Sequence, residues 1–208
     1  MHLLLYNIFI ALYKQLINIA SLSIPKAKKF KRGRKHWHIH LQQKTNALNA
    51  NKTVWIHCAS LGEFEQARPI IEGLKASEPN RTIVLTFFSP SGYEIRKNYK
   101  HADIVAYLPL DTPQNAKLFL EIIQPAIAIF VKYEFWYHYL HQLFQKNIPT
   151  ILIAALFQDR HPFFKWYGGL HRKMLEFFDH IFVQNQHSQQ LLAQINVSKV
   201  TVAGDPRF

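Results

Sequence analysis

The residues with the clearest chemical potential lie where a strongly apolar run meets a polar turn. The run Val54–Ala59 leads into Ser60-Leu61-Gly62-Glu63, and an apolar helical pattern follows. A passage from a buried strand through a turn into a helix would place the Glu63 carboxylate at the strand exit. There it can accept a proton from a sugar hydroxyl and make that oxygen a better nucleophile toward an anomeric carbon.

The spacing of the same residues, taken by itself, favours a structural role. Ser60 and Glu63 stand three residues apart, as in a capping box, in which both side chains bond free amides of the first helical turn. The sequence leaves both roles of Glu63 open. If the turn binds a substrate, Ser60 and Gly62 are expected to contact it.

Further polar residues follow other apolar runs, where backbone amides at helix starts and arginine forks suit anionic or sugar ligands. We expect substrate contacts at Ser89, Ser91, Gly92, Glu134, Arg160 and Arg207. Each has a plainer alternative. A simple turn around Pro90 explains the serines and the glycine, a favourable acid at a helix N-terminus explains Glu134, and both arginines suit an ordinary surface. We interpret His57 as a hydrogen-bonded core histidine.

Short apolar runs alternate with longer segments of helical spacing over most of the chain. The runs are 54–59, 82–87, 104–107, 126–131, 150–155, 180–183 and 200–203, and the helical patterns are 64–74, 116–123, 135–144, 163–178 and 188–195. Nearly continuous hydrophobicity in strands separated by helices indicates a parallel sheet covered on both faces. We therefore predict an α/β fold over residues 53–208, a doubly wound, Rossmann-like sheet with ligands at the carboxyl ends of its strands.

The first 24 residues are mostly Leu, Ile, Ala, Phe and Tyr. They are enough to cross a bilayer, but Lys14 near the middle would cost roughly 2.5–3.5 kcal/mol there. Residues 1–24 are therefore expected to be either a membrane anchor or an in-plane helix. The remaining alternative is an ordinary amphipathic helix packed on the domain.

Residues 25–52 are expected to be a basic flank and linker. Positive charges beside an apolar helix favour the cytoplasmic side of a membrane and anionic headgroups. The residues expected to associate with the membrane are Lys28, Lys29, Lys31, Arg32, Arg34, Lys35 and Trp37.

Composition narrows the class of partner. The 208 residues, 49% of them hydrophobic, suffice for one α/β domain, and a net charge of +12 attracts phosphate-bearing partners. Because the positive run lies beside an apolar segment, we expect an anionic membrane surface as partner and no nucleic acid.

No metal is expected, since the histidines at 36, 38 and 40 have no thiolate or carboxylate at ligand spacing. The sequence contains no GxGxxG or P-loop pattern, which disfavours a dinucleotide or ATP cofactor.

Four stretches, taken together, carry a family resemblance. They are SLGE at 60–63, TFFSPSG at 86–92, YEFW at 133–136 and GDPRF at 204–208. In their order and spacing the chain resembles the bacterial 3-deoxy-D-manno-octulosonic acid (Kdo) transferases, from the apolar N-terminal segment to the last residue. Two positions depart from that pattern. Lys132 stands where the family more often has an acid, and Tyr137 stands where proline is usual.

The resemblance implies the N-terminal, acceptor-binding half of a two-domain GT-B glycosyltransferase. Glu63 would be the general base, and Glu134 would shape the acceptor side of the cleft. Kdo would pass from CMP-Kdo to the lipid A precursor, lipid IVA, in lipopolysaccharide biosynthesis, on the cytoplasmic face of the inner membrane and without a cofactor. CMP-Kdo would bind through a C-terminal domain that these 208 residues do not contain, so we expect no transfer by this chain alone.

Two alternatives to Kdo transfer stay open at this point. The first is another GT-B glycosyltransferase that acts on a lipid-linked acceptor. The second is a non-catalytic, membrane-bound module that retains the acceptor surface. Loss of function on replacement of Glu63 would separate a catalytic site from a binding module, and competition between acceptors would separate the two transferases.

Overall fold

Within residues 2–45 and 53–208, which the computed structural model describes, seven strands form one parallel sheet. The strands are β1 (Thr53–Cys58), β2 (Thr82–Phe87), β3 (Ile104–Tyr107), β4 (Ile127–Val131), β5 (Thr150–Ala155), β6 (His180–Val183) and β7 (Val200–Val202). Every predicted apolar run forms a strand, and each boundary lies within one residue of the prediction. The predicted α/β class and doubly wound, Rossmann-like sheet are confirmed.

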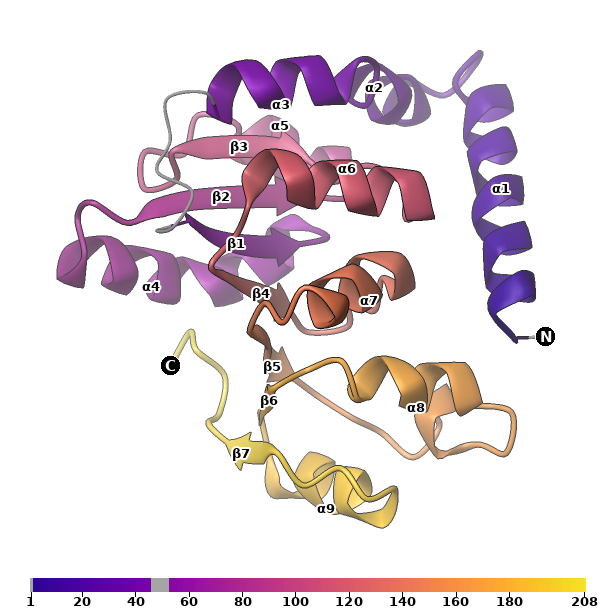
Figure 1. Ribbon diagram of the computed structural model, residues 1–208, viewed down its shortest axis with the longest axis vertical. Coiled ribbons are helices and arrows are strands. Elements are labelled where there is room, and N and C mark those ends of the chain that lie inside the picture. Colours follow the sequence, from indigo (N-terminus) through magenta and orange to yellow (C-terminus); the bar gives the residue numbers. More distant parts are fainter. Residues whose placement is uncertain (1, 46–52) are drawn as a thin grey trace.

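The strand order is β3-β2-β1-β4-β5-β6-β7, so the direction of winding reverses between β1 and β4 (Figure 1). The register of these two strands pairs Trp55 with Ala128 and His57 with Phe130. In a doubly wound sheet, ligands bind in the crevice beyond the carboxyl ends of the strands at such a reversal. The turns that follow β1 and β4 are therefore the first candidates for a functional site.

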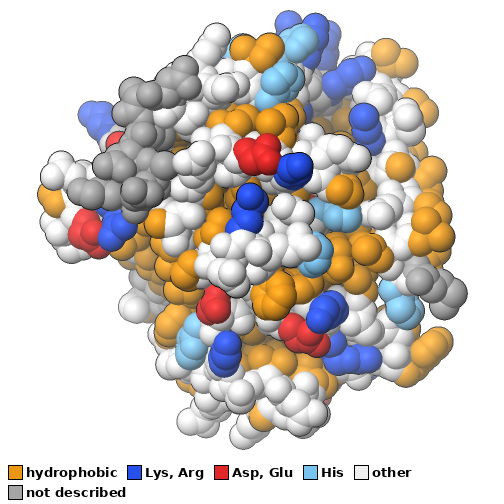
Figure 2. Space-filling model, in the orientation of Figure 1, with side chains coloured by type: hydrophobic (Ala, Val, Ile, Leu, Met, Phe, Trp, Pro, Cys, Tyr) orange, Lys and Arg blue, Asp and Glu red, His pale blue; other side chains and the backbone are white. Residues whose placement is uncertain are grey.

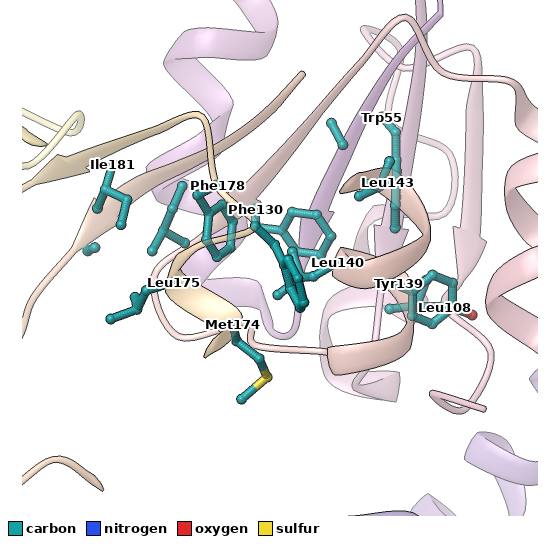
Figure 3. Packing of buried hydrophobic residues seen from close by; sticks show 14 of the residues in the cluster. Trp55, Leu108, Phe130, Tyr139, Leu140, Leu143, Met174, Leu175, Phe178 and Ile181 are labelled. Atoms are coloured by element: carbon teal, nitrogen blue, oxygen red, sulfur yellow. The ribbon is translucent and has the colours of Figure 1, made fainter. Parts of the chain in front are cut away.

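Helices cover the two faces of the sheet in separate groups. α4 (Leu61–Ser77) and α5 (Pro90–Arg96) lie on one face, and α6 (Pro113–Ile123), α7 (Tyr137–Gln145), α8 (Gly169–Leu175) and α9 (Gln186–Gln194) lie on the other. The second face holds the larger core, in which Trp55, Phe130 and Tyr139 are fully buried ring against ring (Figure 3). Burying side chains of this size contributes roughly 1.5–3 kcal/mol each, which holds α7 on the sheet.

The prediction of one helix over residues 163–178 is wrong. A 3-10 turn, η2 (Pro162–Phe164), and the separate helix α8 replace it. The chain folds back so tightly that a Cβ on Gly168 would lie 1.8 Å from the carbonyl oxygen of Pro162. The Arg172 side chain then donates to two carbonyl oxygens of the turn, each at 2.9 Å. Apolar spacing could not reveal this break, because both pieces turn apolar side chains toward the same core.

Two stretches expected to be irregular are helical. α5 begins at Pro90, where the alternative to substrate binding was a simple turn, because the Ser89 side chain caps the helix and proline suits a first turn. The expected flank and linker forms α2 (Pro25–Gly33) and α3 (Trp37–Thr45). α2 buries Ala27 and Phe30, and α3 buries Leu41. Residues 46–52 of the predicted linker lie outside the described residues.

The apolar N-terminal helix, α1 (His2–Ala20), stands across the carboxyl ends of β1 to β3 (Figure 1). One of its faces is tied to the domain. The Tyr6 hydroxyl donates to Asp111 at 2.5 Å, Asn7 Oδ1 and His138 Nε2 lie 2.7 Å apart, and Tyr13 stacks on Phe88. The opposite face is apolar and exposed, with Leu4, Leu5, Ile8, Phe9, Leu12, Leu16 and Ile19.

Asp111 joins α1 to the sheet domain. Its carboxylate is 1% exposed and accepts three hydrogen bonds, one from Tyr6 and two from the N–H groups of His138 and Tyr139, at 3.0 and 3.1 Å. Those two amides belong to the first turn of α7, where backbone N–H groups have no acceptor within the helix. One buried side chain thus satisfies the start of α7 and positions α1.

We predict that Asp111→Ala lowers the free energy of unfolding by roughly 3 kcal/mol or more, because it strands buried donors that have lost their acceptor. Tyr6→Phe removes one of the three bonds and should cost only about 1 kcal/mol. Urea denaturation followed by circular dichroism measures both values. Equal costs for the two variants would contradict this account of Asp111.

Candidate active site

Glu63 lies one turn beyond β1, in the first turn of α4. Its Oε2 accepts hydrogen bonds from the backbone N–H groups of Ala59 and Ser60, the latter at 3.1 Å. The capping box that the spacing predicted is therefore present. Both bonds fall on one carboxylate oxygen of a half-buried side chain, so the capping role leaves Oε1 outside these contacts.

Glu134 lies three residues beyond β4, on the other side of the strand reversal. Unlike Glu63 it is buried, and its Oε2 is held by two side chains. His57 Nε2 lies 3.0 Å away, and the indole N–H of Trp136 donates at 2.6 Å. A buried carboxylate is stable only when it is well bonded, so His57 and Trp136 are what allow Glu134 to sit here.

His57 is fully buried, as expected for a hydrogen-bonded core histidine. Its Nδ1 lies 2.9 Å from the Thr86 hydroxyl, which also accepts from the Trp55 indole at 2.8 Å. Its second nitrogen bonds Glu134, a link that sequence reasoning missed. The available signal was polarity inside two apolar strands, because His57 and Thr86 are direct cross-strand partners.

The two glutamates influence each other electrostatically. Burial and, next to it, the negative charge of Glu134 raise the pKa of Glu63 to about 7. The amides of Ala59 and Ser60 and the ammonium of Lys132 act in the opposite direction and lower that pKa. A carboxyl with this pKa can both accept and release a proton near neutrality, which is what general base catalysis requires.

The turn after β2 lies against the turn after β1. The Ser89 N–H donates to the Ala59 carbonyl at 2.7 Å, and the Ser89 and Ser91 hydroxyls are 2.7 Å apart. Gly92 is required here, since a Cβ would lie 2.4 Å from the Phe87 ring and 3.2 Å from the backbone nitrogen of Leu61. The predicted contacts at Ser60, Gly62, Ser89, Ser91 and Gly92 are thus brought to one edge, next to Glu63.

The two candidate arginines are not part of this group. Arg160 is exposed in the turn after β5. Arg207 is exposed too, and its guanidinium donates to Asp205 at 2.6 and 3.0 Å. Asp205 also accepts a hydrogen bond from Gln66 of α4 at 3.1 Å, so the last residues are tied to the helix that carries Glu63.

Among the described residues, no three His, Cys, Asp or Glu side chains are grouped as a metal site.

The residues expected at the membrane divide into two groups. Lys28, Lys29, Lys31, Arg32 and Lys35 are exposed on or just after α2, and Figure 2 shows Lys and Arg side chains near the top of the molecule, where α2 and α3 lie. Arg34 differs from the expectation, because its guanidinium donates to the carbonyls of Leu108 and Phe88 and lies over the Phe30 ring. Trp37 packs against the core residue Phe119. These two hold α2 and α3 on the domain.

A doubly wound parallel sheet whose winding reverses between β1 and β4 defines a Rossmann-like domain, the architecture expected for half of a GT-B glycosyltransferase. The family profile described as 3-deoxy-D-manno-octulosonic-acid transferase (kdotransferase) matches residues 29–208, and the chain belongs to this family. The matched region contains Glu63, Glu134 and every strand of the described sheet.

Curated relatives carry the same name. The 3-deoxy-D-manno-octulosonic acid transferase of Haemophilus influenzae is 34% identical over 108 residues, which cover 51% of this chain and 25% of the relative. That of Aquifex aeolicus is 32% identical over 167 residues, covering 79% of this chain and 43% of the relative. The matched part of this chain spans less than half the length of either relative.

Solved structures confirm the fold at low sequence identity. A UDP-N-acetylglucosamine 2-epimerase superposes with a TM-score of 0.57 at 14% identity, over 74% of this chain and 48% of the epimerase. The UDP-GlcNAc 2-epimerase of Methanocaldococcus jannaschii gives 0.55 at 12% identity, over 74% and 45%. At such identity the likeness concerns the architecture alone.

We predict that Glu134→Gln lowers the pKa of Glu63 toward the ordinary carboxyl value, because it removes the neighbouring negative charge. Lys132→Met should move the same pKa upward, because it removes a positive charge. Carbon-13 NMR titration of the glutamate carboxyl groups follows both changes. A Glu63 titration that is the same in both variants would rule out the electrostatic coupling.

Proposed function

We propose that this chain supplies the acceptor side of a Kdo transferase, which moves Kdo from CMP-Kdo to the lipid A precursor lipid IVA in lipopolysaccharide biosynthesis. The observation that carries the proposal is the position and pKa of Glu63, at the carboxyl edge of the sheet reversal beside Glu134. Membership of the Kdo transferase family supports the choice of sugar. A carboxyl tuned to about neutrality is suited to activating an alcohol.

In the proposed reaction Glu63 acts as the general base. Its carboxylate takes the proton of the acceptor hydroxyl while that oxygen forms a bond to the anomeric carbon of Kdo. The bond from the anomeric carbon to the CMP phosphate oxygen breaks, and CMP leaves with the electron pair. Glu134 remains bonded to His57 and Trp136 and acts on the reaction through its charge, which keeps the pKa of Glu63 high.

The apolar helix and the family together indicate association with a membrane. α1 is long and apolar enough to cross a bilayer, but contacts from Tyr6 to Tyr13 hold it along the domain. We therefore propose that α1 lies in the plane of the inner membrane surface, on the cytoplasmic face, with its outer apolar side among the lipids. The exposed lysines of α2 would then meet anionic headgroups.

We predict that Glu63→Gln reduces kcat by about 10²- to 10⁴-fold, the usual contribution of a general base. The assay is transfer of labelled Kdo from CMP-Kdo to lipid IVA by the complete gene product. In the wild type the rate should rise with pH through about 7 and then level off, because the base acts only when it is ionised. Glu134→Gln should move that midpoint to lower pH.

The matched control is Glu176→Gln, which removes an exposed carboxylate paired with Lys173 far along the chain from the site. It should transfer Kdo at the wild-type rate. Unchanged turnover in Glu63→Gln would remove the catalytic proposal and leave a binding module. Faster transfer to a lipid-linked acceptor other than lipid IVA would point to a different glycosyltransferase.

We also predict that replacing Lys28, Lys29 and Lys31 by Gln weakens binding to anionic vesicles. At roughly 1 kcal/mol per surface lysine, the loss should be about 100-fold at low salt. Replacing Lys100, Lys117 and Lys146, which are exposed on other surfaces, makes the same change in net charge and serves as the control. Vesicle sedimentation measures binding, and equal losses in both triple variants would contradict a membrane face on α2.

A further inference from the structure

A concave site lies beside the segment that carries Glu134, between α1 and the η2–α8 segment. Its volume is about 350 Å³. The side chains that form its walls are mainly carbon-rich, and they include Tyr6, Tyr133, Phe135, Phe163, Leu170 and Met174. A pocket with such walls selects a hydrocarbon ligand, because polar or charged groups would lose hydration without replacement.

The two histidines in the pocket wall are consistent with a neutral interior. Burial lowers the pKa of His161 and of His171, so both rings are uncharged near neutral pH. His161 Nδ1 already accepts the Gln158 N–H at 3.2 Å. The nearby guanidinium groups of Arg160 and Arg172 lower these two pKa values further, but neither arginine belongs to the pocket wall.

The pocket shares its wall with the candidate active site. Tyr133 directly precedes Glu134 and is anchored through its hydroxyl to the Leu156 carbonyl. Phe135 directly follows Glu134 and packs on Phe163 of η2, with ring centroids 4.8 Å apart. The same short segment thus turns Glu134 toward His57 and turns two aromatic rings toward the pocket.

The pocket also borders the surface that we assign to the membrane. Tyr6 belongs to α1, whose outer face carries exposed Leu4, Leu5 and Ile8. On the other side, the turn between η2 and α8 exposes Trp166 by 93% and Tyr167 by 48%. Trp and Tyr concentrate at the boundary between headgroups and acyl chains. A lipid at that boundary could lower one chain into the pocket.

We propose that this pocket binds one acyl chain of the lipid acceptor and so holds the sugar end of that lipid at Glu63 and Glu134. The inference rests on the proposed function, since it names how the same site binds its acceptor. A methylene group fills about as much space as a liquid water, about 30 Å³, so the pocket has room for on the order of ten chain carbons.

The direct test uses lipid IVA that carries a photoactivatable diazirine in one acyl chain, mixed with the complete gene product in vesicles. We expect label on residues 133–135 and 170–174. Excess unlabelled lipid IVA should abolish that label, whereas phosphatidylglycerol and fully deacylated acceptor should not. Label confined to α1, or equal protection by phosphatidylglycerol, would overturn the proposal, because the pocket would then be empty or filled by bulk lipid.

A variant tests the consequence for catalysis. Leu170→Trp fills the pocket from its wall, and it should raise KM for lipid IVA about tenfold while kcat stays close to wild type, as expected when only binding is lost. Leu118→Trp adds the same side chain at a partly exposed position of α6 and should leave KM unchanged. An unchanged KM in a folded Leu170→Trp protein would overturn the proposal, and the photolabelling of the wild type needs no variant.

The two proposals fail in different ways. Pocket labelling without any Kdo transfer would refute the proposed function and retain a lipid-binding pocket. Kdo transfer that depends on Glu63, together with an unlabelled pocket, would refute the pocket and retain the function.

Discussion

The candidate site depends on the buried carboxylate of Glu134, which is held by hydrogen bonds where the winding of the sheet reverses between β1 and β4. Glu134 is kept there by His57 from β1 and by Trp136 from its own turn, and Thr86 of β2 holds the other side of His57. One hydrogen-bonded chain therefore joins β1, β2 and the turn that follows β4. Removing His57 or Trp136 would leave the buried Glu134 carboxylate without one of its partners, which costs more than losing an ordinary hydrogen bond.

This arrangement separates the roles of the two glutamates. Glu134 is buried and its Oε2 bonds two side chains, whereas Glu63 is only half buried and its Oε2 bonds two backbone amides. The charge of the first raises the pKa of the second. The capping and catalytic interpretations of Glu63, which compete at the level of sequence, are compatible in the structure. The cap bonds one carboxylate oxygen, and the proposed proton transfer would use the other.

The same edge of the sheet also carries the membrane-associated features. Asp111 fastens α1 across the strand ends, and the η2–α8 turn stands beside it with exposed aromatic rings. The proposed function requires the reacting groups to lie close to the bilayer surface without being buried in it. α1 meets that requirement, because one of its faces is bonded to the domain and its other face is apolar and exposed.

The sequence determined the sheet and the position of Glu63, because continuous apolar runs and a Ser-x-Gly-Glu turn are local patterns. It did not reveal the helices α2, α3 and α5, the break before α8, or the inward turn of Arg34, since these depend on close contacts such as that of Gly168 with Pro162. Only the tertiary structure revealed the hydrogen bond between His57 and Glu134 and the position of α1 beside the site. Contacts between residues 77 positions apart, as in His57 and Glu134, leave no periodic trace along the chain.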